Sequence, residues 1–284
     1  MALTDWKVIK QSNLVSVIIP CYNHEKFIQA TLDSIARDTY PYKEIILIND
    51  GSSDHSDQKI TEWISSNNNE IKITYVNRKN KGICSTLNEL IGIAKGKYIL
   101  PLASDDCLYG NAIAQRVSVL ESSPGKYVLL NDAYVIDEND KIIMDSSADY
   151  WGADKSKYQN DEDILRECIE GPKIGGPVIF YNRCIFEEIG LYPEGLQIED
   201  WYFYQRAASK KRILFKDFKV ALYRLHGSNF SGVNTSRAKV LAKSIIRVYL
   251  LNMSFYPGFS KKMLAFKCLL KNIVWYIKLV LKIK

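Results

Sequence analysis

Short apolar runs alternate with longer amphipathic ones through the N-terminal half, and this order limits the folds open to the chain. Residues 15–19 are apolar except for one serine, as expected of a strand that is buried on both faces. Residues 24–37 carry apolar side chains at helical spacing. Further strands are predicted at 44–48, 71–76 and 98–102. The alternation predicts βαβ units and a parallel α/β sheet.

The order of elements changes beyond about residue 125. Short strands are predicted at 127–130, 133–136 and 141–144, and the polar turn between the last two favours antiparallel hairpins. Residues 145–163 are polar with interspersed aromatics, and the segment is too long for a simple turn, so we expect a functional loop. The remaining predicted elements are a strand at 177–181, a helix at 199–210, and helices over 235–283 that are interrupted near Pro257 and Gly258.

Length and composition exclude several classes of protein. The chain has 284 residues and is 47% hydrophobic, which is enough for a packed core and excludes disordered and fibrous proteins. Its first residues lack the basic start and apolar run of a signal peptide, and no stretch reaches about 18 unbroken apolar residues. Six cysteines without a C-x-x-C spacing indicate neither a disulfide scaffold nor a zinc ribbon. We therefore expect a cytoplasmic protein without a spanning helix.

The net charge of +6 hides a division along the chain. Residues 219–284 contain 13 lysines and arginines and no acidic residue, whereas the preceding residues carry 25 basic and 32 acidic side chains. This asymmetry indicates a polyanionic partner, either a nucleic acid or an anionic membrane surface. Composition alone leaves both open.

Polar or acidic loops follow three of the predicted strands, at the edge of a parallel sheet where ligands usually bind. They contain residues 20–23, 49–54 and 103–106. Turn formation and helix capping explain any one of these loops, but all three together less well. The third loop holds two adjacent carboxylates, Asp105 and Asp106, which repel each other unless water, a cation or hydrogen-bond donors compensate. A Mg²⁺ or Mn²⁺ ion is the simplest explanation, because both prefer oxygen ligands.

The sequence lacks a P-loop and a strand followed by G-x-G-x-x-G, so ATP hydrolysis and ordinary dinucleotide binding lose their usual support. Five other segments stand out by their order and spacing: VSVIIPCYNHEKFIQATLDSI, EIILINDGSSD, NKGICSTLNELIGIAKGKYILPLASDD, GGPVIFYNRCIFEEIGLYPEGLQIEDWYFYQRA and YRLHGSNFS. In these segments the chain resembles family 2 glycosyltransferases with the GT-A fold. The resemblance covers about residues 14–232.

The resemblance implies both an architecture and an activity. The expected fold is a mixed α/β sheet flanked by helices, with a GT-A domain over residues 1–232. Within it, residues 14–125 would bind the nucleotide-sugar and residues 126–232 would form the acceptor and catalytic half, followed by a basic helical tail at 233–284. The implied reaction transfers a sugar from a nucleotide-diphospho-sugar to an acceptor hydroxyl, usually with inversion at the anomeric carbon.

The resemblance also implies roles for individual residues at the donor site. Tyr22 would lie against the nucleotide base, and Asp50 would accept a hydrogen bond from a ring N–H, which favours a UDP-sugar. Asp105 matches a carboxylate on the ribose or metal side. The remaining expected donor-binding residues are Pro20, Asn23, Lys81 and Gly82, although Lys81 and Gly82 are also compatible with a plain loop before a helix.

A divalent cation, Mn²⁺ or Mg²⁺, is the expected cofactor. The resemblance makes Asp106 its main ligand, with Asp105 and His226 as further candidates. Many members of the family have another aspartate where this chain has Ala103, so the site has one fewer carboxylate available. His226 is also compatible with a structural, hydrogen-bonded role.

Asp200 matches the family's general base, which takes the proton of the acceptor hydroxyl as it attacks. Glu199 would orient the acceptor or Asp200. Both acids also suit a helix N-terminus, where negative charge complements the helix dipole, and this reading is compatible with catalysis.

The last residues predict a basic amphipathic helix. Four lysines, Lys267, Lys271, Lys278 and Lys282, fall within about 60° on a helical wheel and leave apolar side chains on the remainder. Such a helix suits an anionic membrane surface, with Trp275 and Tyr276 at the depth of the lipid headgroups. Nucleic acid fits less well, because the other face is apolar.

A membrane-facing tail on a glycosyltransferase indicates a lipid-linked acceptor. The chain resembles bacterial enzymes of cell-surface polysaccharide, O-antigen and lipopolysaccharide synthesis, which implies a peripheral protein on the cytoplasmic face of the inner membrane. Two alternatives remain open from the sequence: a sugar-nucleotide nucleotidyltransferase, and a non-catalytic membrane-associated binding module.

Overall fold

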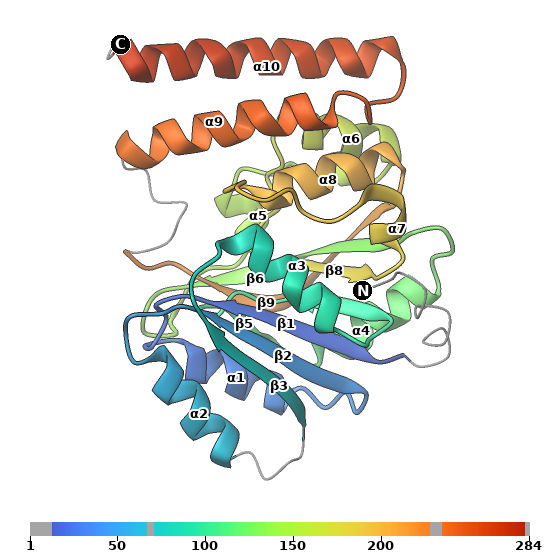
Figure 1. Cartoon of the computed structure of the whole chain (residues 1–284). Helices are drawn as coiled ribbons and strands as arrows, with labels where there is room; N and C mark the ends of the chain where they lie inside the picture. Colours follow the sequence, from blue (N-terminus) through green and yellow to red (C-terminus); the bar gives the residue numbers. More distant parts are fainter. Residues whose placement is uncertain (1–12, 67–70, 228–234, 282–284) are drawn as a thin grey trace.

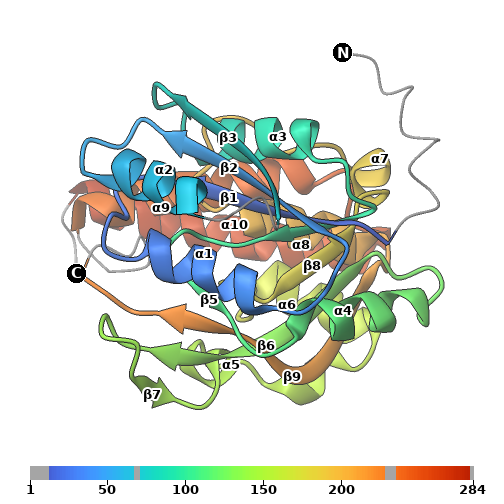
Figure 2. The ribbon, with the colours of Figure 1, turned by 90° about the horizontal axis from the view of Figure 1, so that it is seen from below.

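A single mixed sheet runs through the molecule, with helices on both of its faces (Figures 1 and 2). The computed structural model describes residues 13–66, 71–227 and 235–281. Within these residues the strand order is β3-β2-β1-β4-β8-β6-β9-β5, and β7 pairs with β6. This is the helix-flanked α/β sheet that the sequence predicts.

Four parallel strands form one half of the sheet. They are β1 (Val15–Cys21), β2 (Lys43–Asp50), β3 (Lys72–Arg78) and β4 (Tyr98–Pro101). The side chains of β1 and β2 are buried on both faces, which explains their continuous apolar sequences. Helices α1 (Ile28–Arg37) and α2 (Ser56–Ser66) cover one face (Figure 2), and α3 (Ile83–Ile93) covers the other. The βαβ order predicted from the alternation is confirmed.

The other half of the sheet is mostly antiparallel. It consists of β5 (Cys107–Leu108), β6 (Val128–Ile136), β7 (Ile142–Met144), β8 (Ile179–Asn182) and β9 (Ile213–Arg224). Strand β8 joins the two halves, because it pairs antiparallel with both β4 and β6. Strand β9 lies parallel to β6 and antiparallel to β5.

One predicted strand boundary is wrong. The strands expected at 127–130 and 133–136 form the single strand β6, which passes through Asn131 and Asp132. Both polar residues are buried, and the Asn131 side-chain amide donates to the carbonyl of Lys216 at 2.9 Å. The hairpin expected after them is confirmed, because β6 pairs antiparallel with β7 around the predicted polar turn.

The segment expected to be a long functional loop at 145–163 contains helical turns instead. It includes α5 (Ser147–Tyr150), the 3₁₀ helix η2 (Lys155–Tyr158) and the start of α6 (Asp161–Glu170). Polar side chains begin all three, since Ser146, Asp154 and Asn160 each accept a backbone N–H at the N-cap. The residues that indicated a loop are therefore mainly helix caps.

Asp132 fastens this segment to the sheet. Its carboxylate is fully buried and accepts hydrogen bonds from the Ser146 hydroxyl at 2.7 Å, the Ala148 N–H at 3.1 Å and the Lys155 ammonium at 2.7 Å. Lys219 of β9 forms a further ion pair with it. Burial alone would raise the pKa of Asp132, but the hydrogen bonds from both lysines and from Ser146 hold it well below the usual range.

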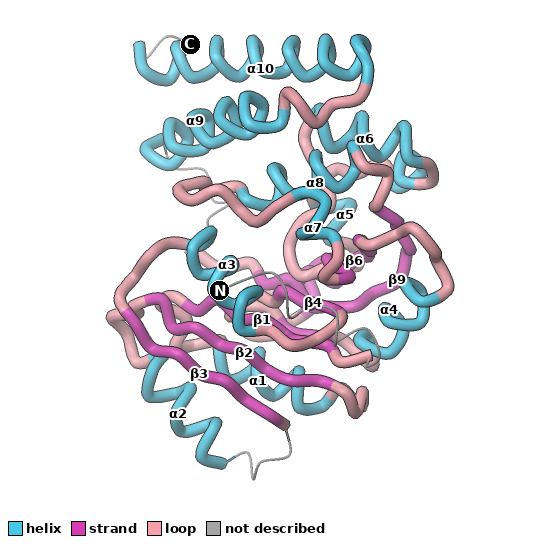
Figure 3. Tube along the Cα trace, turned by 45° about the vertical axis from the view of Figure 1, so that its right-hand side comes forward, coloured by secondary structure: helices cyan, strands magenta, loops and turns pink. Residues whose placement is uncertain are grey.

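The C-terminal helices α9 (Thr235–Asn252) and α10 (Gly258–Leu281) pack in successive layers over α8 (Glu199–Ser209), as Figures 1 and 3 show. The Tyr256 hydroxyl donates to the side-chain oxygen of Gln205 on α8 at 2.6 Å. The buried Asn252 amide also binds Gln205, at 2.9 Å. The predicted helical segment with its break near Pro257 is confirmed, and it shares the core of the sheet domain. Helices α4 (Ala112–Glu121) and α7 (Ile185–Ile189) complete the fold.

We expect Asp132→Asn to lower the free energy of unfolding by about 3 kcal/mol, because it leaves two lysines without their buried counterion. Chemical denaturation in urea measures this. Since the pKa of Asp132 is depressed in the folded state, the stabilisation is present above the ordinary aspartate pKa of about 3.9 and is lost as the pH falls below it. The difference between variant and wild type should therefore shrink in acid.

Asp217→Asn is the matched control, because Asp217 is exposed and pairs only with Lys155. Its cost should stay below about 1 kcal/mol. Equal losses in the two variants would show that the buried carboxylate has no special role.

Candidate active site at the strand ends

The loops after β1 and β2 are hydrogen-bonded to each other. Asn23 donates its backbone N–H to the Ser52 hydroxyl at 2.9 Å and accepts the Ser53 N–H through its side-chain oxygen at 2.8 Å. Asn23 adopts a left-handed conformation with φ of 55°, which asparagine tolerates better than most residues. Pro20 lies within β1 opposite Ile48, one residue before the strand ends. The two predicted donor-site loops therefore lie together.

Asp50 anchors the loop that precedes α3. Its two carboxylate oxygens accept the backbone N–H groups of Lys81 at 2.8 Å and Gly82 at 3.0 Å. Gly51, directly after it, has φ of +74°, and a Cβ there would lie 2.6 Å from the backbone nitrogen of Asn80. Only glycine allows this close approach. The backbone thus holds Asp50, Lys81 and Gly82 as one unit.

Arg78 pairs with Asp50 and was not found by sequence reasoning. Its guanidinium also donates to Glu89 at 3.0 Å and to the Thr86 hydroxyl at 2.9 Å. A carboxylate has about four acceptor positions. Arg78, Lys81 and Gly82 use three of those of Asp50, which leaves one position on the oxygen that Gly82 contacts.

His24, Asp105 and His226 form a cluster with the donor set of a metal site. One potential ligand atom from each lies within 4.8 Å of the others. Nε2 of His226 is 2.9 Å from an Asp105 carboxylate oxygen, and Nε2 of His24 is 3.7 Å from the same oxygen. Two imidazoles and a carboxylate suit a divalent transition ion such as Mn²⁺. The rest of the quoted YRLHGSNFS segment beyond Gly227 lies outside the described residues.

The register between β5 and β9 explains how residues that are far apart in the sequence meet at the cluster. Cys107 lies opposite Leu222 in this antiparallel pair, so the residues just before Cys107 face those just after Leu222. His24 reaches the cluster from the β1 loop, where its Nδ1 lies 2.7 Å from the Ser104 hydroxyl. Sequence reasoning missed His24, although its position directly after a strand loop was a usable signal.

Asp106 lies outside the cluster, contrary to the expectation that it is the main ligand. Its side chain is buried, and one oxygen accepts the backbone N–H of Arg224 at 2.8 Å. Burial and the negative charge of Asp105 raise the pKa of Asp106 well above its usual value. Burial also acts on Asp105, but the hydrogen bond from His226 and the two histidine charges lower its pKa. The adjacent carboxylates thus differ in their contacts and in the direction of their pKa shifts.

Arg224 is buried and binds the loop between the two halves of the site. Its Nε donates to the carbonyl of Asp105 at 2.7 Å, and its guanidinium pairs with Asp140 at 2.6 Å. Asp140 is a surface acid, so the guanidinium pairs with a charged group of the protein itself. Arg224 therefore fixes the backbone that carries the aspartates.

Glu199 and Asp200 begin α8, as the sequence predicts. Burial raises the pKa of both, and the charge of Asp200 adds to the effect on Glu199, whose pKa rises to about 8. One Asp200 oxygen accepts the Trp201 N–H at 2.8 Å. The other faces Gly175, where a Cβ would lie 4.0 Å away. Among the described residues, no cation pairs with either carboxylate.

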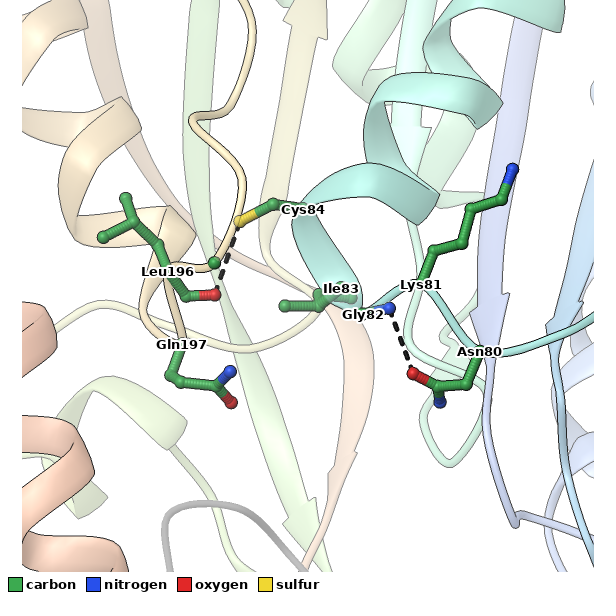
Figure 4. A pocket seen from close by; sticks show the side chains of 8 residues that line it. Asn80, Lys81, Gly82, Ile83, Cys84, Leu196 and Gln197 are labelled. Atoms are coloured by element: carbon green, nitrogen blue, oxygen red, sulfur yellow. Dashed lines mark hydrogen bonds between the residues drawn. The ribbon is translucent and has the colours of Figure 1, made fainter.

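Two cavities flank these groups. The first, of about 360 Å³, lies between the start of α3 and the segment before α8, with Lys81 and Gly82 on one wall and Leu196 and Gln197 on the other (Figure 4). The second, of about 350 Å³, is lined by His24 and His226 together with the turns around them. Tyr22, directly after β1, is half exposed. The first cavity lies between the unit fixed by Asp50 and the approach to Glu199.

Known proteins resemble the chain in both sequence and structure. It is 32% identical over 203 residues to an uncharacterized glycosyltransferase of Rickettsia prowazekii, which covers 70% of this chain and 60% of the relative. It is 29% identical over 255 residues to an uncharacterized glycosyltransferase of Haemophilus influenzae, covering 86% of this chain and 74% of the relative. The chain thus spans less than two thirds of the length of the Rickettsia protein.

Solved structures show the same fold. TarS of S. aureus in complex with UDP-GlcNAc superposes with a TM-score of 0.67 at 18% identity, covering 95% of this chain and 76% of TarS. A mannosyltransferase of Pyrobaculum calidifontis in complex with GDP-Man and Mn²⁺ gives a TM-score of 0.64 at 14% identity, covering 96% and 75%. The family model described as Glycosyl transferase family 2 matches residues 16–190, more than half of the chain. Together with the mixed GT-A-like sheet, this match shows that the chain belongs to glycosyltransferase family 2.

Proposed function

We propose that this protein transfers a sugar from a nucleotide-diphospho-sugar, a UDP-sugar by preference, to a hydroxyl of a lipid-linked glycan, with inversion at the anomeric carbon. The observation that carries the proposal is the environment of Asp200, a carboxylate with a raised pKa that lies at the start of a helix, faces Gly175 and pairs with no cation of the described residues. A base needs these properties. Family membership favours this activity over a nucleotidyltransferase or a non-catalytic module.

The donor base would contact the unit fixed by Asp50. The free acceptor position on this carboxylate suits the ring N–H of uracil, and the exposed Tyr22 ring offers a surface for stacking. Arg78 would keep Asp50 ionised and oriented. The complex of TarS with UDP-GlcNAc supports a uridine donor, since that protein shares the fold.

The divalent cation would bind to Asp105, His24 and His226 instead of Asp106. The Mn²⁺ in the Pyrobaculum mannosyltransferase supports manganese as the ion. When bound, such an ion supplies Lewis-acid stabilisation of the charge on a leaving diphosphate. The side chains of this protein contribute the ligands, and Ser104 orients the His24 ring through Nδ1.

Asp200 would take the proton of the acceptor hydroxyl as that oxygen attacks from the face opposite the leaving group. This geometry gives inversion in one displacement and requires no covalent bond to the protein. Glu199 lies next to Asp200, and its raised pKa of about 8 keeps it protonated near neutral pH, which would leave Asp200 as the ionised carboxylate of the pair.

The acceptor is proposed to be lipid-linked because the outer face of α10 suits a membrane surface. All of its exposed large apolar residues except Val280 form one stripe along the helix, which we call the outer stripe: Phe259, Met263, Phe266, Leu270, Val274, Ile277 and Leu281. Exposed lysines flank it at Lys262, Lys267, Lys271 and Lys278. Lys282 lies outside the described residues.

The charge beside the outer stripe favours an anionic surface as its partner. Exposed lysines flank the apolar residues, and α10 contains no acidic residue. None of the helices in the described ranges has the length and apolarity needed to span a bilayer.

Trp275 and Tyr276 do not belong to this outer face, contrary to the expectation that they lie at headgroup depth. Trp275 packs against the core, and the Lys243 ammonium lies 5.7 Å from the centre of the Tyr276 ring. The exposed aromatic rings of α10 are Phe259 and Phe266. We therefore propose a peripheral position on the cytoplasmic face of a bacterial inner membrane, in the synthesis of a cell-surface polysaccharide, O-antigen or lipopolysaccharide.

We expect Asp200→Asn to lower the transfer rate by a factor of about 10² to 10⁴, the usual contribution of a general base, while donor affinity stays within about twofold. Coupled release of nucleoside diphosphate measures the rate, and calorimetry with the nucleotide measures binding. In the wild type, transfer should rise with pH, since a base with a raised pKa is ionised only above that pKa.

Glu199→Gln is the companion variant. Because Glu199 is protonated below its pKa of about 8, the uncharged glutamine should leave the acid limb of the pH profile close to that of the wild type, with activity retained. A profile that is flat for the wild type, or an acid limb displaced by more than about one pH unit in this variant, would contradict the assignment of the pair.

We expect Asp105→Asn to raise the Mn²⁺ concentration needed for half-maximal turnover by at least about 10- to 100-fold, because the cluster loses its only carboxylate. A Mn²⁺ titration of turnover measures this. His55→Ala is the control, since His55 pairs with Glu25 on the surface outside the cluster. An unaltered Mn²⁺ requirement in the Asp105 variant would refute this site.

We expect the double variant Phe266→Ser and Val274→Ser to lose co-sedimentation with phosphatidylglycerol-containing vesicles. Replacement of Lys267, Lys271 and Lys278 by glutamine should weaken binding by about 1 kcal/mol per lysine at low salt, and vesicles of phosphatidylcholine alone should bind weakly. Leu191→Ser, an exposed apolar residue outside α10, is the control. Point changes are preferable to deletion of residues 261–284, because buried Ala265 and Leu269 belong to the core.

A further inference from the structure

Three aromatic rings from distant parts of the sequence meet at the edge of the candidate active site. The ring centres of Tyr150 and Trp151 are 5.0 Å apart, and those rings lie 6.3 Å and 6.2 Å from the ring of Tyr223. Tyr223 is buried, whereas Tyr150 and Trp151 remain 40% and 37% exposed. The cluster therefore has a buried base and two rings that solvent reaches.

Contacts of two glycines connect this cluster to the proposed base. A Cβ on Gly176 would lie 2.9 Å from the Tyr223 ring, and a Cβ on Gly175 would lie 4.0 Å from an Asp200 oxygen. Tyr223 also directly precedes Arg224, which binds the Asp105 loop. The rings thus lie beside the Gly175–Gly176 segment, which also faces Asp200.

Hydrogen bonds to the sheet hold the segment that carries the two exposed rings. Tyr150 is the last residue of α5 and Trp151 follows it. Helix α5 is fastened to the sheet because Asp132 accepts hydrogen bonds from the Ser146 hydroxyl and the Ala148 N–H. Lys155, just beyond Trp151, binds the same carboxylate at 2.7 Å. A platform fixed in this way loses little conformational freedom when a ligand binds to it.

We infer that Tyr150 and Trp151, supported by Tyr223, form a platform that binds a pyranose ring of the acceptor by stacking. The inference rests on the proposed function and names a subsite for its acceptor. The faces of a pyranose carry C–H groups with partial positive charge, which are attracted to the negative face of an aromatic ring. Aromatic side chains with a few nearby polar groups are typical of such sites. The sugar hydroxyls at the rim would then be directed towards Asp200.

The test uses the full-length protein with Mn²⁺ and UDP-glucose, UDP-galactose and UDP-N-acetylglucosamine as donors. The acceptor probes are methyl glycosides of glucose, galactose, mannose and N-acetylglucosamine. Two rates are measured: release of UDP with water as the only acceptor, and transfer to the glycosides. Trp151→Ala should reduce transfer at least about tenfold, mainly through a higher KM for the glycoside, while UDP release to water stays unchanged.

Two variants make the result specific. Trp151→Phe keeps an aromatic face and should retain most of the transfer activity. Tyr42→Ala removes another exposed tyrosine, which precedes β2 at the opposite end of the strands, and should change neither rate. Unchanged UDP release in Trp151→Ala also shows that the variant is folded and binds donor.

The outcomes separate this inference from the function on which it rests. If the wild type releases no UDP with any donor, the proposed function fails and the platform with it. If the wild type releases UDP but accepts none of the glycosides, or if Trp151→Ala transfers as well as the wild type, the platform is refuted and the function stands. Loss of transfer to a lipid-linked glycoside alone would identify the rings as a contact for the lipid chain and would also overturn the inference.

Discussion

The antiparallel pairing of β5 with β9 is the contact on which the candidate site depends. It is very short, since β5 contains only Cys107 and Leu108, yet it places the end of β9 against the loop after β4. Arg224, the last residue of β9, stabilises this pairing through two hydrogen bonds. Its backbone N–H donates to the Asp106 carboxylate, and its Nε donates to the carbonyl of Asp105. Without this pairing, His226 would have no reason to lie near Asp105, because 121 residues separate them in the chain.

The same pairing gives two adjacent carboxylates different chemical properties. Asp106 is turned into the protein, where burial and its neighbour raise its pKa, whereas Asp105 is held ionised by His226. The two carboxylates at the start of α8 do not shift in opposite directions, since burial raises the pKa of both Glu199 and Asp200. The fold thus gives the proposed cation site a carboxylate with a lowered pKa and the proposed acceptor side two carboxylates with raised pKa values. This separation of pKa values is typical of sites that combine metal and base chemistry.

Hydrophobic periodicity was sufficient to predict the parallel half of the sheet, because buried parallel strands have continuous apolar sequences. It was insufficient where buried polar residues continue a strand, because their partners come from remote parts of the chain. Asn131 and Asp132 interrupt the apolar sequence but continue β6, and Lys155 and Lys219 supply the counterions of Asp132. The identity of the metal-side carboxylate was unpredictable for the same reason, as neighbouring aspartates differ only in what the tertiary fold places around them. Arg78 and His24 gave no local signal of their partners.

The proposed membrane contact and the proposed base lie on helices that are hydrogen-bonded to one another. Arg206 on α8 donates to Asn252 of α9 at 2.8 Å, and Tyr256, between α9 and α10, donates to Gln205 of α8 at 2.6 Å. Helix α8 begins with Glu199 and Asp200, α10 is the outermost of the stacked helices (Figures 1 and 3), and the side chains of its outer stripe are exposed. A bilayer bound to that stripe would therefore hold Asp200 at a fixed depth and orientation. An acceptor anchored in the same bilayer needs to search only a layer of solution for the base, which raises its effective concentration without any additional contact at the site.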